Sequence, residues 1–179
     1  MEIIYRADYV FHCLSHFADI SNDIRNELSK EYKQNEIQNQ INMPGSKFYS
    51  SFTKSPQELI KILQSKFPVA FKSLKPEPDG KVRLSFKFEV PIGTSSLVSY
   101  EELTEEEKKT IKSEIRDNCS IKTVIVDRTM PTEECQLILI SEGEQFYFCT
   151  AFPGELAPPL PQSDETGDPY WDTHLFIRQ

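Results

Sequence analysis

The sequence predicts an α+β fold in which N-terminal helices pack on one face of an antiparallel sheet of about four to five strands. Apolar residues recur every three to four positions early in the chain, and they alternate with polar residues later. A run of helices followed by a run of strands is typical of α+β folds. We expect one domain, 1–179, with a helical part at about 7–67, a sheet part at about 82–152, and a Pro-rich strap with a final strand at 153–179.

Two helices are predicted in the helical part. The first covers about residues 7–30, and its apolar stripe consists of Val10, Leu14, Phe17, Ile20, Ile24 and Leu28. The second begins after Ser55, a favourable N-cap, with Pro56 at the first helical position and Glu58 placed to close a capping box. Segment 33–46 between them is polar and rich in amides, which predicts a surface connection.

The sheet part is predicted from alternation of apolar and polar residues. The expected strands are 82–90, 121–127, 135–141 and 145–152, with a final short strand in 173–179. A short helix is expected over 103–118, because Thr104 and Glu107 form a possible capping box and Asn118 is a possible stop.

The charge of the chain restricts the partners that it can have. There are 28 acidic and 20 basic residues, so the formal net charge is −8. A surface of this sign repels polyanions at long range, and nonspecific nucleic-acid binding depends on neutralising phosphates. We therefore expect no DNA partner, whereas a small basic pocket for RNA remains compatible with the composition.

The sequence also indicates where the protein resides. Glu2, Arg6 and Asp8 stand where a signal peptide would need an apolar core, and no uncharged stretch reaches the roughly 18 residues that span a bilayer. The four cysteines are widely spaced and include no Cys-x-x-Cys pair, which favours reduced structural thiols over a zinc or redox site. We expect a cytoplasmic protein without membrane contact.

The strand at 145–152 ends in an unusual way. Strict alternation would place Phe146, Phe148, Thr150 and Phe152 on one face, and Tyr147, Cys149 and Ala151 on the other. Pro153 removes a ladder donor and Gly154 frees the backbone, so the strand must stop there. One interpretation is purely structural: the prolines that follow form a stiff strap leaving the sheet.

A second interpretation comes from resemblance. The segment "TAFPG" at 150–154, after an apolar hairpin and upstream helices, resembles the last core strand of the ribonuclease toxin superfamily that groups barnase, EndoU, certain colicins and RelE. The resemblance covers about 55–152 in outline, and its specific motif is five residues long. It implies metal-independent, cofactor-free cleavage of RNA through the ribose 2′-OH, as in bacterial toxins.

The resemblance also implies a role for individual residues of this strand. Thr150 matches the threonine of the motif, which commonly supplies a polar contact. Where the family often has a tyrosine, this chain has Phe152, so that hydroxyl contact is absent. Tyr147 faces the other side in this pattern and cannot simply replace it, but it is a candidate substrate contact.

The acid, the base and the phosphate contacts must come from elsewhere in the chain. His174 and Arg178 would share one face of the final strand and make an acid/base and phosphate pair, although a surface histidine and arginine at a chain end is the simpler interpretation. His16 and Arg25 are the nearest matches to the upstream catalytic residues of the family. Arg128 is a further candidate in a segment that reads equally well as an ordinary turn.

Two alternatives to the nuclease stay open. His12 and His16 lie four residues apart beside Asp8 and Asp19, so they could bind a metal, or they could form a polar helix face; we expect no metal. The acidic charge also suits a non-enzymatic protein-binding module, either of the immunity type or with the "PPLP" segment as a ligand. The expected partner is RNA in the first case and a cognate protein in the second.

Overall fold

The computed structural model describes residues 2–162 and 166–178, and it confirms the α+β class. The helices are α1 Ala7–Cys13, α2 Asn22–Leu28, α3 Gln34–Ile41, α4 Pro56–Lys66, α5 Glu105–Lys108 and α6 Tyr170–Thr173. The strands are β1 Lys47–Phe48, β2 Lys81–Lys87, β3 Gly93–Thr94, β4 Leu97–Ser99, β5 Lys112–Arg116, β6 Cys119–Ile125, β7 Pro131–Thr132, β8 Glu134–Glu142, β9 Gln145–Pro153 and β10 His174–Arg178. None of the helices in these ranges is long and apolar enough to cross a membrane.

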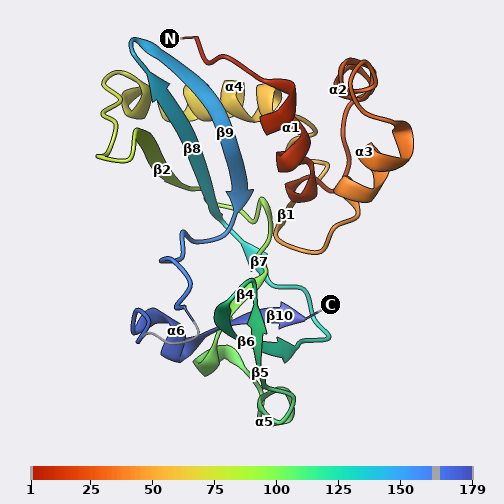
Figure 1. Cartoon of the computed structure of the whole chain (residues 1–179), viewed down its shortest axis with the longest axis vertical. Helices are drawn as coiled ribbons and strands as arrows, with labels where there is room; N and C mark the ends of the chain where they lie inside the picture. The colour runs from red at the N-terminus through yellow and green to blue at the C-terminus, as the bar shows by residue number, and fades with distance from the viewer. Residues whose placement is uncertain (1, 163–165, 179) are drawn as a thin grey trace.

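The strands are distributed over three sheets, whereas we expected one. The first sheet has the antiparallel order β2-β8-β9, the second has the order β4-β10-β6-β5 with β10 parallel to β6, and a small third sheet has the order β1-β3-β7. In Figure 1 the first sheet lies in an upper lobe and the second in a lower lobe, with the small sheet between them. Alternation assigns a residue to a face but does not choose the neighbouring strand, so the sequence could not separate these sheets.

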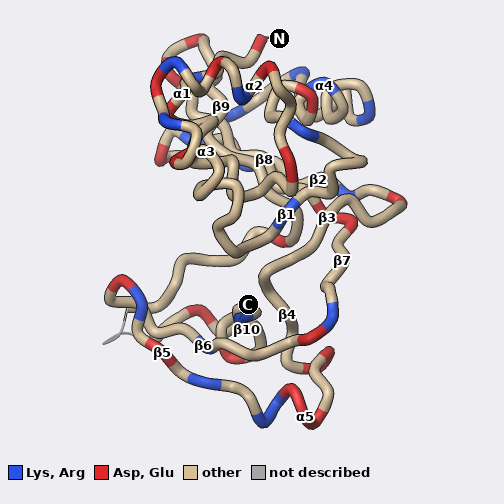
Figure 2. Tube along the Cα trace, turned by 90° about the vertical axis from the view of Figure 1, so that its right-hand side faces the viewer, with Lys and Arg blue, Asp and Glu red and all other residues tan. Residues whose placement is uncertain are grey.

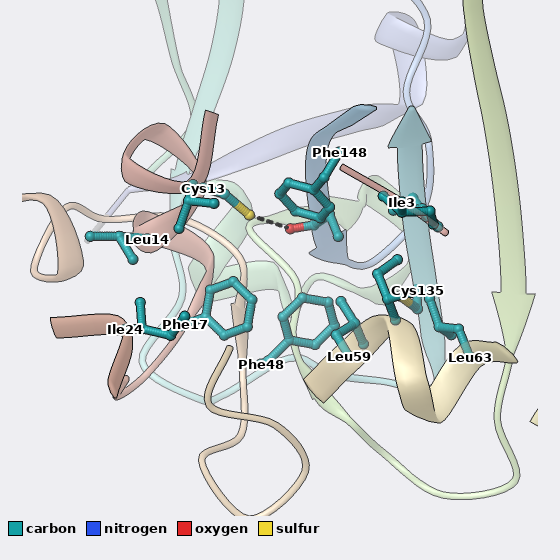
Figure 3. Packing of buried hydrophobic residues seen from close by; sticks show 14 of the residues in the cluster. Ile3, Cys13, Leu14, Phe17, Ile24, Phe48, Leu59, Leu63, Cys135 and Phe148 are labelled. Atoms are coloured by element: carbon teal, nitrogen blue, oxygen red, sulfur yellow. Dashed lines mark hydrogen bonds between the residues drawn. The ribbon is translucent and has the colours of Figure 1, made fainter. Parts of the chain in front are cut away.

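The core of the upper lobe lies between the β2-β8-β9 sheet and the N-terminal helices. The rings of Phe17 and Phe48 lie 5.5 Å apart, and neither side chain is exposed (Figure 3). Leu59 and Leu63 of α4 belong to the same cluster as the β8 leucines. The predicted packing of N-terminal helices on one face of a sheet therefore describes this lobe.

A separate and smaller cluster of buried residues lies in the lower lobe. It consists of Val98, Leu103, Val124 and Leu175. These residues come from β4, the loop before α5, β6 and β10, so the final strand holds this lobe together. The prediction of one domain stays a prediction, and the buried residues form two clusters.

The predicted helix over 7–30 is wrong in its middle. A 3-10 turn at Leu14–His16 follows α1, and the backbone at Phe17 is then extended. Phe17 forms a β-bridge to Phe48, which uses its apolar side chain in the core without continuing the helix. The Ser21 side chain then caps α2, because an N-terminal serine supplies an acceptor for an otherwise unpaired N–H.

Segment 33–46 contains a helix where a surface connection was predicted. Ile37 and Ile41 of α3 are 0% and 4% exposed, so one face of this short helix joins the core. Their spacing of four was the signal for a helix, and it was outweighed by the many amide side chains around it.

The predicted helix over 103–118 is correct only in its first turn. The expected capping box forms: the Thr104 side chain accepts from the N–H of Glu107, and the Glu107 carboxylate accepts from the N–H of Thr104. After α5 the chain instead enters β5, which pairs with β6 through Asp117 and Asn118 at φ values of 50° and 63°. Two consecutive left-handed residues make the tight turn that suits a twisted hairpin.

The helix after Ser55 is confirmed. The Ser55 side chain accepts from the N–H of Glu58 at 3.0 Å, and Pro56 occupies the first turn. The carboxylate of Glu58 accepts from the N–H of Lys54 at 2.6 Å, one residue earlier than an ordinary capping box would have it. The N-cap and the start of this helix were therefore predicted correctly, whereas the predicted capping box from Glu58 back to Ser55 does not form.

The Pro-rich segment after β9 runs from the upper to the lower lobe (Figure 1). The indole N–H of Trp171 donates to the carbonyl oxygen of Pro159 at 3.0 Å, and the Trp171 ring stacks on Phe176 of β10. The strap is therefore held against the lower sheet by the only tryptophan in the chain.

Candidate functional site

A cleft of about 300 Å³ lies where the outer face of the β2-β8-β9 sheet meets the lower lobe. Its walls come from the end of β9 and the strap after it, the 3-10 turn after α1, the chain between β3 and β4, and one residue of β10. The polar or aromatic residues that matter below are His16, Ser46, Ser96, Thr150, Phe152 and Glu155. The cleft thus collects groups from segments far apart in the sequence.

A β-bulge turns Thr150 toward this cleft. Phe148 lies opposite Leu139 and Thr150 lies opposite Ile138, so Cys149 is an extra residue in β9. Ala151 is fully buried like Phe148, although strict alternation would put these two on opposite faces. Our assignment of Thr150 to the face of Phe148 was therefore wrong, because one inserted residue reverses the alternation.

The same bulge changes the position of the neighbouring side chains. Phe152 follows Thr150 to the outer face, where it lines the cleft. Tyr147, which precedes the bulge, pairs with Ile140 and lies on that outer face too, rather than on the opposite side from Thr150. Bulges of this kind are frequent next to active sites, where they redirect a side chain.

His16 forms the wall opposite the strand end. Its Nδ1 lies 3.1 Å from the carbonyl oxygen of Ser46, and its ring centroid lies 5.6 Å from that of Phe152. Because a carbonyl oxygen only accepts, Nδ1 must carry the hydrogen, and Nε2 is left with its lone pair. The hydrogen bond therefore selects the tautomer in which Nε2 is a base.

The surroundings of His16 keep the ring neutral. Burial lowers its pKa most strongly, the hydrogen bond to Ser46 opposes that shift, and the charge of Lys47 lowers the pKa further. A histidine whose pKa is below its ordinary value is unprotonated at neutral pH. His16 can therefore accept a proton from a bound molecule without first losing one.

Ser46 holds this wall in place. Its hydroxyl lies 2.9 Å from that of Ser96 and accepts from the Ser96 N–H at 3.0 Å, so the loop before β1 is tied to the chain before β4. Lys47 is turned away, because its ammonium donates to the carbonyl oxygens of Ser15 at 2.7 Å and Ile41 at 2.6 Å. The lysine beside the cleft thus anchors backbone and does not line the cavity.

The third wall carries a carboxylate linked to His174. The hydroxyl of Tyr170 donates to Glu155 Oε1 at 2.6 Å, and Nε2 of His174 lies 3.6 Å from the same oxygen. The rings of Tyr170 and His174 stack with centroids 3.8 Å apart. Burial, followed by the hydrogen bond to Glu155, raises the pKa of Tyr170. His174 does not itself line the cleft, but its partner Glu155 does.

The predicted arginines lie away from the cleft. Arg128 forms a two-pronged pair with Glu107, at 3.2 and 3.1 Å, and also donates to the carbonyl oxygen of Glu102. The guanidinium of Arg178 donates to the carbonyl oxygen of Thr110 at 3.2 Å in the lower lobe. Both residues are thereby used to hold the chain around α5.

Arg25 and Tyr147, two further candidates, also lie outside the cleft. Arg25 of α2 donates to the side chain of Gln38 at 3.5 Å, between α2 and α3. The Tyr147 hydroxyl donates to Gln145 at 2.9 Å within β9. Thr150 and His16 therefore line the same cleft, and His174 is linked to that cleft through Glu155. The other predicted site residues lie outside the cleft.

The described residues offer no evident metal centre. Within residues 2–162 and 166–178, no group of three or more His, Cys, Asp or Glu side chains is close enough to hold an ion. His12 is exposed on α1, whereas His16 is turned into the cleft after that helix ends. The two histidines therefore do not share the helical face on which the metal hypothesis depended.

Sequence reasoning missed three polar groups of this site, Ser46, Ser96 and Glu155. Nothing in the sequence marks the two serines, because their meeting depends on how the lobes pack. Glu155 carried a weak signal, since it is the first side chain after the Pro-Gly end of β9. No protein-family model and no curated protein matches this chain, so only its own residues indicate what the cleft does.

Proposed function

We propose that the protein is a metal-independent ribonuclease of the bacterial toxin type that cleaves RNA through the ribose 2′-OH. The observation that carries the proposal is the meeting of His16 and Thr150 in one cleft. The first supplies a neutral ring with an available Nε2, and the second is the threonine of the "TAFPG" segment. The bulge at Cys149 supports it, because it puts Thr150 on the face of β9 that lines the cleft.

The cleft residues suit the two halves of the reaction. Nε2 of His16 takes the proton of the 2′-OH while the 2′-oxygen forms a bond to phosphorus and the bond from phosphorus to the 5′-oxygen breaks. The products are a 2′,3′-cyclic phosphate and a free 5′-hydroxyl. The hydroxyl of Thr150 donates to a non-bridging oxygen, where negative charge grows in the transition state.

The leaving 5′-oxygen needs a proton donor on the opposite side. We assign this step to His174, which would donate from Nε2; its Nδ1 lies 3.0 Å from the Tyr170 carbonyl oxygen, and its Nε2 lies 3.6 Å from Glu155 Oε1. The assignment requires that the Glu155 side chain move aside when substrate binds, because Glu155 lines the cleft and contacts Nε2 of His174, whereas His174 itself does not line the cleft.

The test is cleavage of total cellular RNA by purified protein in EDTA. His16→Asn keeps a donor for the Ser46 carbonyl but removes Nε2, and should lower the cleavage rate about 10²- to 10⁴-fold. Thr150→Val keeps the shape but removes the hydroxyl, and should lower it about 10²- to 10³-fold. His12→Asn is the matched control, because His12 is exposed and outside the cleft.

Retained cleavage in both cleft variants, with thermal stability unchanged, would show that the activity comes from another site or from a contaminant. Loss of cleavage in His12→Asn as well would contradict the assignment of the base to His16. Intact RNA with the parent protein would remove the nuclease proposal altogether.

A non-enzymatic protein-binding module is the second candidate. The observation that favours it is that no lysine or arginine is among the described residues that line the cleft. A nuclease gains from such cations, because negative charge grows on the phosphate in the transition state. Charged positions are spread over both lobes (Figure 2). If the parent leaves RNA intact, a pull-down for a basic protein partner is the measurement that decides in favour of this function.

A further inference from the structure

The β2-β8-β9 sheet has an open edge at β2. This strand is last in the sheet order, so only one of its sides has a neighbouring strand (Figure 1). The carbonyl of Gly80 accepts from Ser141, and the N–H of Phe88 donates to Glu133. In an antiparallel ladder the residues that bond to the neighbour alternate with those that face outward. The even-numbered residues of β2 therefore bond to β8.

The backbone groups of the odd-numbered residues point to the open side. The carbonyl of Lys81 confirms this direction, because it accepts from the N–H of Glu77 in the preceding loop. Arg83 is partly covered by that loop, through ion pairs with Glu77 and Asp79. In the part of the chain that the structure describes, the outward N–H and C=O groups of Ser85 and Lys87 form no hydrogen bond to another loop or strand.

An apolar groove of about 480 Å³ runs along this edge. Its floor includes Phe67 and Phe86, and Val69 on its rim is 73% exposed. A largely exposed valine beside the buried ring of Phe86 and the half-buried ring of Phe67 is apolar surface that a bound side chain would cover. The groove and the open edge together offer both backbone partners and a side-chain pocket.

The charge at the groove is positive although the whole chain is negative. Lys66 and Lys87 line it, no acidic residue does, and neither lysine forms an ion pair with the described residues. The ammonium of Lys66 lies 5.2 Å from the ring centroid of Phe88, which places it beside the strand end.

We propose that this edge binds an extended acidic peptide segment of a partner protein by strand addition. Main-chain bonds to Ser85 and Lys87 would supply affinity, one apolar side chain would enter the groove beside Val69, and flanking carboxylates would meet Lys66 and Lys87. This surface is separate from the cleft at the end of β9, so the proposal does not depend on the nuclease.

A second copy of the chain is a poorer occupant than an acidic segment. Antiparallel pairing of two β2 strands centred on Leu84 would set Lys81 of one copy opposite Lys87 of the other. Like charges directly opposite each other in a sheet are destabilising. The same cations favour a partner whose outward side chains are acidic.

The test uses a fluorescent peptide of four glutamates alternating with three valines, and a matched peptide with lysine in place of glutamate. Binding is measured by anisotropy at about 0.15 M salt, where long-range repulsion by the net charge is screened beyond about 8 Å. The parent should bind the acidic peptide, and Lys66→Glu combined with Lys87→Glu should weaken binding about tenfold or more. Val69→Glu should weaken it as well.

Two controls separate strand addition from general attraction. Lys112→Glu changes one charge in the same way on an exposed edge strand of the other lobe, and should leave binding unchanged. Hydrogen exchange should slow at the amides of Ser85 and Lys87 when peptide is bound, whereas Leu84 and Phe86 already bond to β8 and should not change.

The proposal is overturned if the acidic peptide does not bind at about 1 mM, or if the lysine peptide binds as well. Unchanged exchange at Ser85 and Lys87 in a saturated complex would also overturn it, since binding would then be elsewhere. A dimer in sedimentation that is lost in Val69→Glu would assign the edge to a second copy instead.

Discussion

At the scale of single residues, His16 shows how one hydrogen bond and burial together set the chemistry of a side chain. The Ser46 carbonyl, 3.1 Å from Nδ1, fixes where the hydrogen lies. Burial makes the charged ring costly and lowers its pKa. The remaining nitrogen is therefore a base because of its surroundings, and no feature of the local sequence determines this.

The lowered pKa of His16 predicts how stability changes with pH. The unfolded chain has the ordinary histidine pKa of about 6.5 and binds the proton more readily than the folded protein. The contribution of His16 to the free energy of unfolding is fully present above pH 6.5, and it is lost as the pH falls through the lower pKa of the folded protein. The free energy of unfolding in urea should decrease between pH 7.5 and pH 5.5, and this decrease should be smaller in His16→Asn than in the parent.

His12→Asn serves as the reference, because His12 is an exposed histidine that does not line the cleft. An identical pH dependence in the parent and in His16→Asn would mean that the buried ring is not the titrating group.

At the scale of elements, capping residues predicted the starts of helices correctly, whereas apolar periodicity did not predict their ends. Ser55 and Thr104 cap α4 and α5 as predicted, but the second of these helices lasts only four residues. A cap stabilises the first turn, whereas the length of a helix depends on what its apolar face packs against. The strand β5 follows α5 because it pairs with β6.

The cap of α4 gives a prediction at this scale. Ser55→Ala removes the acceptor for the N–H of Glu58, 3.0 Å away, and should lower the free energy of unfolding by about 1 kcal/mol. Ser65→Ala, at an exposed position inside the same helix, should change it by less than about 0.5 kcal/mol. Chemical denaturation of both variants would compare them, and equal effects would mean that the cap contributes nothing.

At the scale of the whole molecule, the two buried clusters differ greatly in size. The upper cluster joins helices α1 to α4 to the β2-β8-β9 sheet, whereas the lower one contains four buried members among the described residues, Val98, Leu103, Val124 and Leu175. Elements with few buried apolar contacts open at lower free energy than the large core does. The cleft lies between the two, so its width depends on how they stay together.

We predict that the lower lobe opens before the rest of the protein. Amides of β6 and β10 should exchange with solvent at least about tenfold faster than those of β8 under native conditions. Leu175→Ala, in the smaller cluster, should increase exchange in β6 and β10 and leave β8 unaffected. Hydrogen exchange followed by mass spectrometry measures both, and equal protection in the two lobes would indicate a single cooperative unit.

The sequence by itself determined the class of the fold and several of its elements. Alternation identified β2, β6, β8, β9 and β10, and the Ser-Pro start identified α4, because strand faces and helix caps depend on nearest neighbours along the chain. It also drew attention to Thr150 and His16 as separate candidates.

Only the tertiary structure decided how these parts come together. One inserted residue, Cys149, reversed the face of Thr150, and no local pattern announces an insertion whose partner strand is not known. The pairing of strands into three sheets, and the meeting of His16, Ser46 and Glu155 around one cleft, depend on contacts between distant segments. Such contacts are set by the packing of the whole chain, which periodicity and capping do not encode.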